Sequence, residues 1–325
     1  MTDRPHPNTI TRRAALAALA WAPASLSFAA APRSMSRGAN EGQVRLPDGR
    51  CLSYAEFGIP SGPLVLYFHG TPGARLEGEL IHEEATARGV RLVAVERPGI
   101  GHSTYQTCRK ILKWPADVAN LVSLLGYGDS PFGILAVSGG APYALACEVC
   151  MPERLTHVAI ISGHTPLSAP VVPGNQDARI RRFGRRPRLA NIVSRIGIHM
   201  LHHKPEKFTD NVADSWSASD RQLVLCNPVL KAKFLANMRE TVRCGNAGIL
   251  TDVRLLGGYW GYKLSEVPVV STSFWQGGCD RIATPSMGEY FHRCLPHSEY
   301  YFDPKAGHVT TLKWHATEIL AHFPA

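Results

Sequence analysis

A strand, a tight turn and a helix follow one another in residues 132–146, FGILAVSGGAPYALA, and this order constrains the fold more than any other stretch. Residues 132–137 are apolar and mostly β-prone, as in a strand buried on both faces of a parallel sheet. Ser138 comes next, followed by two glycines and an alanine-rich helical run. A serine at such a turn is typical of a nucleophile elbow, which holds the hydroxyl at the carboxyl edge of the sheet.

The small residues around Ser138 bear on the chemistry of the turn. The N–H of Gly139 would lie at the N-terminus of the following helix, where partial positive charge favours an oxyanion. The pattern is Ala136-x-Ser138-x-Gly140, with alanine where G-x-S-x-G has its first glycine. By itself the match also fits an ordinary strand-to-helix connection, so the rest of the chain has to decide.

The N-terminal residues 1–31 have the composition of an export signal. Arg12 and Arg13 precede an alanine-rich apolar run that is too short and too weakly apolar for a membrane span, and small residues favour a cut after Ala29. We expect a twin-arginine signal peptide and a periplasmic or secreted protein without stable membrane insertion. The alternative is a disordered tail or a misassigned start on a cytoplasmic protein.

Length and composition allow one large α/β domain with an insertion, or two modest domains, because 45% of the 325 residues are hydrophobic. Eight scattered cysteines do not form the framework of a small disulfide scaffold. Cys147 and Cys150 form a C-x-x-C, but they lie well inside a predicted helix, whereas a redox pair needs its first thiol at a helix N-terminus. We expect them to pack as small hydrophobic residues.

Strand and helix patterns alternate along the chain, which predicts a doubly wound, mostly parallel sheet preceded by a hairpin over residues 44–58. Residues 165–265 interrupt the alternation with a helix-rich, polar segment. We expect this segment to be a helical lid over the carboxyl edge of the sheet, inserted between core segments 42–164 and 266–325. The predicted sheet strands are residues 63–68, 91–95, 132–137, 157–162, 267–275 and 299–302.

The predicted lid contains amphipathic helices over residues 206–216, 218–226 and 228–243, and an arginine-rich stretch, RIRRFGRRPR, over residues 179–188. The arginines could face an anionic substrate, lipid headgroups or nucleic acid, or form a solvated surface. Phe183 is the one aromatic residue among them and no nucleic-acid fold signature is present, so we expect no nucleic-acid partner. An anionic small-molecule substrate stays an open alternative.

Three residues with catalytic chemistry each fall just after a predicted strand: Ser138, Asp280 and His308. The carboxyl ends of parallel strands meet at one edge of a sheet, so these side chains are expected to converge. A serine nucleophile needs a base such as His308, and an acid such as Asp280 would hold that imidazole in the right tautomer. Asp303 and Asp252 are less well placed alternatives for the acid.

A second glycine-rich turn, HGTPG over residues 69–73, follows the first apolar strand after the hairpin. The N–H of Thr71 is a candidate oxyanion donor beside that of Gly139, whereas Pro72 has no N–H to donate. The loop ERPGIGHS over residues 96–103 lacks a phosphate-binding pattern and is expected to be structural.

From about Val44 to the C-terminus the sequence resembles the α/β-hydrolase fold family, in particular its capped single-domain serine hydrolases. The resemblance implies cleavage of an ester, amide, thioester or lactone through an acyl-enzyme, with a small or medium carboxylic ester or lactone favoured here. Departures from the family pattern are Ala136 in the elbow and Glu96, where an aspartate is usual. The motifs that carry the resemblance are HG-x-P-G at 69–73, RPG-x-G-x-S at 97–103, V-S-G-G at 137–140, the stretch 277–285 around the acid, and G-H at 307–308.

Some functions within the family stay open and others do not. Members that open epoxides or displace halide use an aspartate nucleophile, so Ser138 argues against both. Prolyl aminopeptidases hold the substrate amine with lid carboxylates, and this lid is basic. Cofactor-free haloperoxidases, perhydrolases and C–C bond hydrolases keep a serine triad, and a noncatalytic ligand-binding relative is the other alternative. No cofactor and no metal are expected; His202 and His203 would point about 100° apart on a helix.

Overall fold

The computed structural model describes residues 40–324, apart from the side chains of Gln176 and Arg179. The predicted signal peptide, residues 1–31, lies outside the described residues. Within them, no helix is long and apolar enough to cross a membrane.

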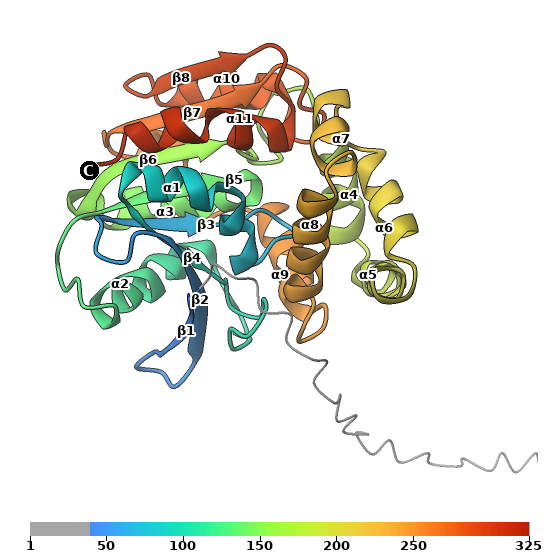
Figure 1. Cartoon of the computed structure of the whole chain (residues 1–325), viewed down its shortest axis with the longest axis horizontal. Helices are drawn as coiled ribbons and strands as arrows, with labels where there is room; N and C mark the ends of the chain where they lie inside the picture. The colour runs from blue at the N-terminus through green and yellow to red at the C-terminus, as the bar shows by residue number, and fades with distance from the viewer. Residues whose placement is uncertain (1–39, 325) are drawn as a thin grey trace, which may run out of the picture. The chain divides into compact units, whose positions relative to one another are not determined.

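An eight-stranded sheet in the order β1-β2-β4-β3-β5-β6-β7-β8 forms the centre of the described chain (Figure 1). Strand β2 runs antiparallel to its neighbours β1 and β4, and every other neighbouring pair is parallel. The predicted doubly wound, mostly parallel sheet is therefore confirmed. The strands are β1 (Asn40–Arg45), β2 (Cys51–Gly58), β3 (Leu64–Phe68), β4 (Arg91–Val95), β5 (Phe132–Val137), β6 (Leu155–Ile161), β7 (Thr272–Gly277) and β8 (Glu299–Asp303).

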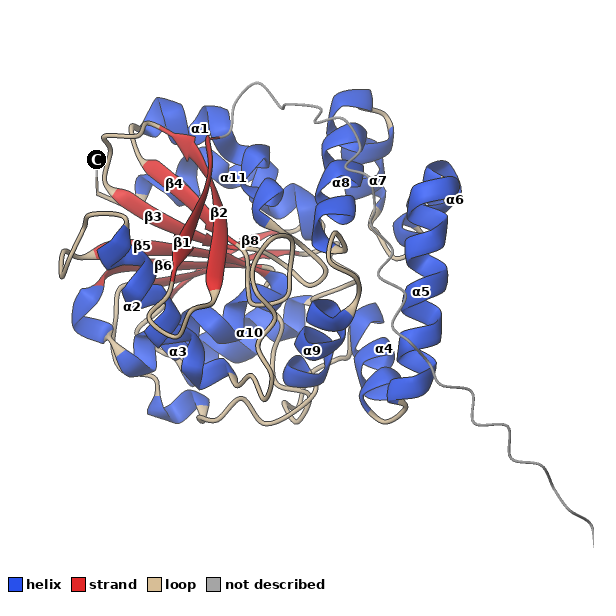
Figure 2. Cartoon of the chain, turned by 90° about the horizontal axis from the view of Figure 1, so that it is seen from below, coloured by secondary structure: helices blue, strands red, loops and turns tan. Residues whose placement is uncertain are grey.

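Helices cover both faces of the sheet (Figure 2). On one face lie α1 (His82–Arg88) and α11 (His308–Ala321), and on the other α2 (Trp114–Leu124), α3 (Ala141–Cys150) and α10 (Pro285–Cys294). Because both faces are covered, strands β3 and β5 are buried along their whole length and read as continuous apolar runs.

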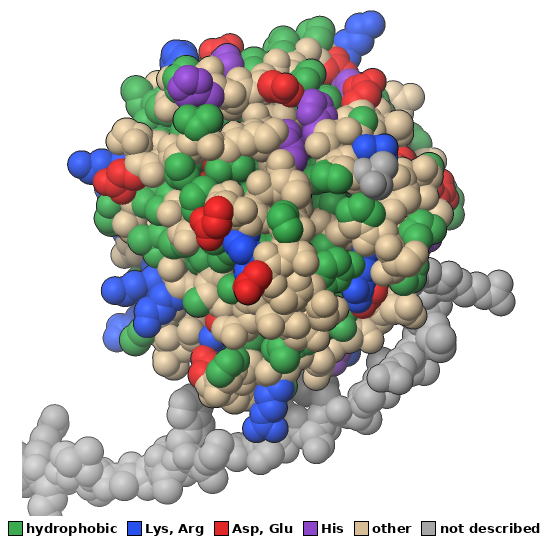
Figure 3. All heavy atoms as spheres, turned by 90° about the vertical axis from the view of Figure 1, so that its left-hand side faces the viewer, with side chains coloured by type: hydrophobic (Ala, Val, Ile, Leu, Met, Phe, Trp, Pro, Cys, Tyr) green, Lys and Arg blue, Asp and Glu red, His purple; other side chains and the backbone are tan. Residues whose placement is uncertain are grey.

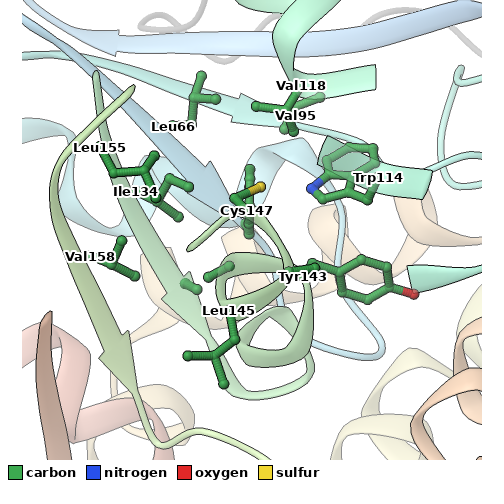
Figure 4. Packing of buried hydrophobic residues seen from close by; sticks show 14 of the residues in the cluster. Leu66, Val95, Trp114, Val118, Ile134, Tyr143, Leu145, Cys147, Leu155 and Val158 are labelled. Atoms are coloured by element: carbon green, nitrogen blue, oxygen red, sulfur yellow. The ribbon is translucent and has the colours of Figure 1, made fainter. Parts of the chain in front are cut away.

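The core beneath α2 and α3 shows how the helix that follows Ser138 is anchored (Figure 4). Trp114 and Tyr143 meet edge to face with ring centroids 6.1 Å apart, and Cys147 packs in the same cluster. Burial raises the pKa of the Cys147 thiol well above its usual value and also raises the pKa of Cys150. All eight cysteines are free, so this C-x-x-C lacks the stabilised thiolate of a redox pair.

A helical insertion, as we call the helices between β6 and β7, lies at the carboxyl ends of the central strands (Figure 1). The three amphipathic helices predicted there correspond to α6, α7 and α8, and the arginine-rich residues 179–188 span the end of α4 and the start of α5. Its helices are α4 (Asn175–Gly184), α5 (Pro187–His203), α6 (Pro205–Ala213), α7 (Ala218–Leu225), α8 (Pro228–Thr241) and α9 (Ala247–Leu256).

Figure 3 shows the face that lies away from the insertion in Figure 1. Acidic and basic side chains are scattered there among hydrophobic ones, without an extended patch of one sign. The net charge of +9 is therefore not gathered on this face.

The boundaries predicted for one strand were wrong. Residues 267–275 were expected to form it, but β7 runs from Thr272 to Gly277. Pro268 has no N–H for the ladder and the Val269 side chain is 73% exposed, so the apolar residues before Thr272 do not join the sheet. As a result Asp280 follows the end of its strand by only three residues.

Close packing between the insertion and the core can be tested with two glycines. A Cβ at Gly248, on α9, would press against the backbone carbonyl of Gly99, whereas a Cβ at Gly197, on α5, would meet no atom within 4 Å. We expect Gly248→Ala to lower the free energy of unfolding by about 1–3 kcal/mol and Gly197→Ala to raise it by up to about 1 kcal/mol. Urea unfolding measures both; a Gly248→Ala variant as stable as wild type would contradict this packing.

Candidate active site

Ser138 occupies a sharp turn between β5 and α3. Its φ is +52°, a left-handed conformation that costs a residue with a side chain about 1–3 kcal/mol and is common at functional sites. The next two residues have no room for side chains: a Cβ at Gly139 would lie 2.5 Å from Thr71 Oγ1, and one at Gly140 would press against the carbonyl of Phe68. The turn therefore has the geometry of a nucleophile elbow.

The alanine that replaces the first glycine of the elbow fits without disturbing it. Ala136 lies in β5, paired with Phe68 of β3 and Ile160 of β6, and its methyl group is fully buried. The departure from G-x-S-x-G therefore falls in the core of the sheet.

His308 and Asp280 form a hydrogen-bonded pair at the same edge of the sheet. His308 is the first residue of α11, and its Nδ1 lies 2.8 Å from Asp280 Oδ2. The other carboxylate oxygen, Oδ1, accepts the N–H groups of Ile282 at 2.8 Å and Ala283 at 3.0 Å. An ionised carboxylate only accepts, so Nδ1 carries the proton and the neutral ring keeps its lone pair on Nε2.

Opposing effects act on the protonation of His308. Burial by itself lowers the pKa of the imidazole, but the nearby carboxylates of Asp280, Asp220 and Glu77 outweigh burial and raise the pKa above its usual value. These acids come from three different parts of the chain: the loop after β7, helix α7 and the 3₁₀ helix η1 (Arg75–Ile81).

The loop of residues 69–73 is held against the elbow by Arg97, which is almost fully buried. Its guanidinium donates to the carbonyl of His69 at 2.6 Å, to the carbonyl of Gly70 at 2.7 Å and to Thr71 Oγ1 at 2.9 Å. Burial lowers the pKa of Arg97 to about 10. The sequence marked Arg97 as part of a loop motif, but nothing in the motif shows which backbone oxygens it binds.

Glu77 supports the same loop from the side of the cavity. Its Oε1 accepts the N–H of Gly70 and the hydroxyl of Tyr67, both at 3.0 Å, and burial raises the pKa of the carboxyl group. Sequence reasoning did not find this residue, because its helix shows only amphipathic spacing.

The two alternative acids are bound elsewhere. Asp252, on α9, accepts from Arg97 Nε at 2.9 Å and pairs with Arg109. Asp303 lies 2.9 Å from His315 Nε2. Asp280 is thus the acid that the structure brings to His308.

Ser138 and His308 line one cavity of about 340 Å³ between the core and the insertion. The hydrogen bonds of the described residues do not include one from Ser138 Oγ to His308 Nε2; the two side chains share the cavity wall. Most of the other lining side chains are apolar. From the insertion they include Ile180, Phe183, Phe208, Val212, Trp216, Val224, Leu230, Phe234, Met238 and Val253.

No metal site stands out in the part of the chain that the structure describes: residues 40–324 contain no group of three or more His, Cys, Asp or Glu side chains that could hold an ion. His202 and His203 lie in the last turn of α5, and both are exposed.

The architecture matches that of many solved structures, although no protein-family model and no curated protein matches the sequence. A hydrolase from Pseudomonas aeruginosa PA01 has a TM-score of 0.66 at 15% identity, over 88% of this chain and 99% of that chain. A thermophilic esterase from Thermogutta terrifontis has a TM-score of 0.62 at 16% sequence identity, over 87% of this chain and 96% of that chain. A bromoperoxidase from Bacillus anthracis has a TM-score of 0.64 at 16% sequence identity, over 87% of this chain and 98% of that chain. At such identities the likeness shows the fold alone: the chain has the α/β-hydrolase fold.

The role of Arg97 can be tested by Arg97→Met. The variant removes the three guanidinium hydrogen bonds to the loop of residues 69–73, so we expect the free energy of unfolding to fall by about 3 kcal/mol, as when one partner of a buried ion pair is removed. Arg221→Met is the control, because Arg221 is half exposed and lies 4.0 Å from Asp214; its expected cost is below about 1 kcal/mol. Unfolding in guanidinium chloride measures both variants. Equal losses of unfolding free energy in Arg97→Met and Arg221→Met would contradict the role of Arg97.

Proposed function

We propose that the chain is a serine hydrolase that cleaves a carboxylic ester or lactone with an apolar acyl group through an acyl-enzyme. The observation that carries the proposal is that Ser138 and His308 line one apolar cavity, with Asp280 bonded to the far side of the imidazole at 2.8 Å. The fold is consistent with this activity, and the solved structures named above include a hydrolase and an esterase.

In the proposed mechanism Ser138 Oγ attacks the ester carbonyl while His308 Nε2 takes the proton of the hydroxyl group. Asp280 stabilises the imidazolium that forms. The oxyanion of the tetrahedral intermediate is held by the N–H groups of Gly139 and Thr71. The protonated His308 then gives its proton to the leaving alcohol. Water, activated by the same base, releases the acid and restores Ser138.

The cavity favours an apolar acyl group over an anionic one. Among the lining side chains that the structure describes, Lys233 is the one lysine or arginine, and it lies 3.5 Å from Glu79. The described arginines of the 179–188 stretch are exposed and do not line the cavity. The described side chains of the cavity wall therefore support an apolar acyl group better than the anionic substrate suggested by those arginines.

The nucleophile can be identified with a fluorophosphonate probe read by intact mass. We expect a single adduct on wild type and none on Ser138→Ala, with hydrolysis of p-nitrophenyl esters reduced at least about a thousandfold in the variant. Ser123→Ala, an exposed serine on α2, is the control and should label like wild type. A folded wild type that takes up neither probe nor ester would overturn the proposal in favour of a noncatalytic ligand-binding protein.

The acyl preference follows from the cavity walls. We expect kcat/KM to rise from p-nitrophenyl acetate to octanoate, since each buried methylene contributes about 0.8 kcal/mol. Leu230→Trp narrows the cavity from α8, so it should reduce kcat/KM for the octanoate ester at least tenfold. The variant should keep kcat/KM for the acetate ester within about twofold of wild type. An unchanged ratio of the two rates would show that the acyl chain binds elsewhere.

A further inference from the structure

A carboxylate of the insertion is buried against the start of the helix that carries His308. Asp220 lies on α7 and is fully buried. Its Oδ2 accepts the backbone N–H of His308 at 2.8 Å, and its Oδ1 accepts those of Val309 and Thr310, both at 2.9 Å. The hydroxyl of Thr310 adds a fourth bond at 3.0 Å.

Helix α11 has no N-cap side chain that could accept its first N–H groups. Its N-cap residue is Gly307, and a Cβ there would press against Ser217 Oγ and the carboxylate of Asp220. The first N–H groups of a helix lack partners within it and carry partial positive charge. The cap that α11 needs is therefore supplied by a helix 88 residues earlier in the chain.

Asp220 is itself held in place. Ser217 Oγ, at the N-cap of α7, accepts the backbone N–H of Asp220 at 3.1 Å. The carboxylate thus joins the first turn of α7 to the first turn of α11, and it holds the backbone of His308 while Asp280 holds the ring.

We propose that Asp220 is a positioning residue for the base His308, supplied to the active site by the insertion. This inference rests on the proposed function. Asp220 fixes where the imidazole sits, through the backbone of α11, and its negative charge favours the imidazolium that forms when the serine is deprotonated. The insertion is then part of the catalytic apparatus, and a movement that withdrew α7 from α11 would disable the base.

The kinetic test is Asp220→Asn, which keeps the shape of the side chain and removes its charge. The base must be neutral to act, so kcat/KM falls as pH drops through the pKa of His308. Groups that raise this pKa are Asp280, Asp220 and Glu77. We expect the variant to move the acidic limb to lower pH and to reduce kcat by about tenfold to a hundredfold, with KM within about twofold. Asp214→Asn, an exposed aspartate at the end of α6, is the control and should match wild type.

A second readout does not depend on activity. NMR titration of the His308 imidazole, assigned by its loss in His308→Gln, should give a lower pKa in Asp220→Asn than in wild type. Thr310→Val removes one hydrogen bond to Asp220 but keeps its charge, so it should lose stability and leave this pKa unchanged. If Asp220→Asn does not fold, Asp220→Ser replaces the charge with a neutral capping hydroxyl.

The possible failures are distinguishable. An unchanged His308 pKa and an unchanged pH profile in Asp220→Asn would overturn the inference about Asp220 even if Ser138 takes up the probe. Conversely, an inactive, unlabelled wild type would overturn the proposed function, and the NMR titration would still decide whether Asp220 acts on His308.

Discussion

The burial of one guanidinium group organises this end of the molecule. Arg97 contacts the carbonyls of His69 and Gly70 and the hydroxyl of Thr71, and all of these oxygens belong to the turn that faces the elbow. A buried charge is costly unless it is paired and its donors are satisfied. Asp252 of the insertion provides the pairing. The loop conformation therefore depends on the contact between core and insertion, because the buried guanidinium of Arg97 needs the carboxylate of Asp252, which also pairs with Arg109.

Other parts of the site also contact a buried aspartate of the insertion. Asp220 of α7 accepts the first N–H groups of the helix that begins at His308. Asp177 of α4 lies 2.8 Å from His164 Nε2, and the backbone N–H of His164 donates to the carbonyl of Ser138 at 3.2 Å. Each segment that presents a candidate catalytic group is thus in contact, directly or through one residue, with a buried aspartate of the insertion. Buried aspartates on three helices of the insertion, α4, α7 and α9, therefore contact the core beside the candidate site.

This dependence on distant partners explains what the sequence could and could not predict. The sheet and the convergence of Ser138, Asp280 and His308 follow from local patterns, because each residue comes within five residues of the end of a strand and parallel strands share one carboxyl edge. The partners of Arg97 and the cap provided by Asp220 depend on how an insertion folds back over the sheet, and no local pattern encodes that. The start of β7 was misplaced because the apolar residues before Thr272 look like strand, but Pro268 has no N–H for the ladder and Val269 is exposed.

The residues that anchor the insertion to the core and the residues that line the cavity lie on the same helices. On α7, Asp220 caps the helix of His308 while Val224, one turn later, lines the cavity; residues four apart lie on the same face of a helix. On α8, Asn237 accepts the N–H of Ala74 while its neighbour Met238 lines the cavity. The helix backbones are therefore fixed by their polar contacts with the core, and the cavity can change only through the side chains between them. If the proposed function is correct, substitutions in the cavity wall can reshape the acyl site and leave Ser138 and His308 in place, whereas shifting α7 to enlarge the site would displace His308 as well.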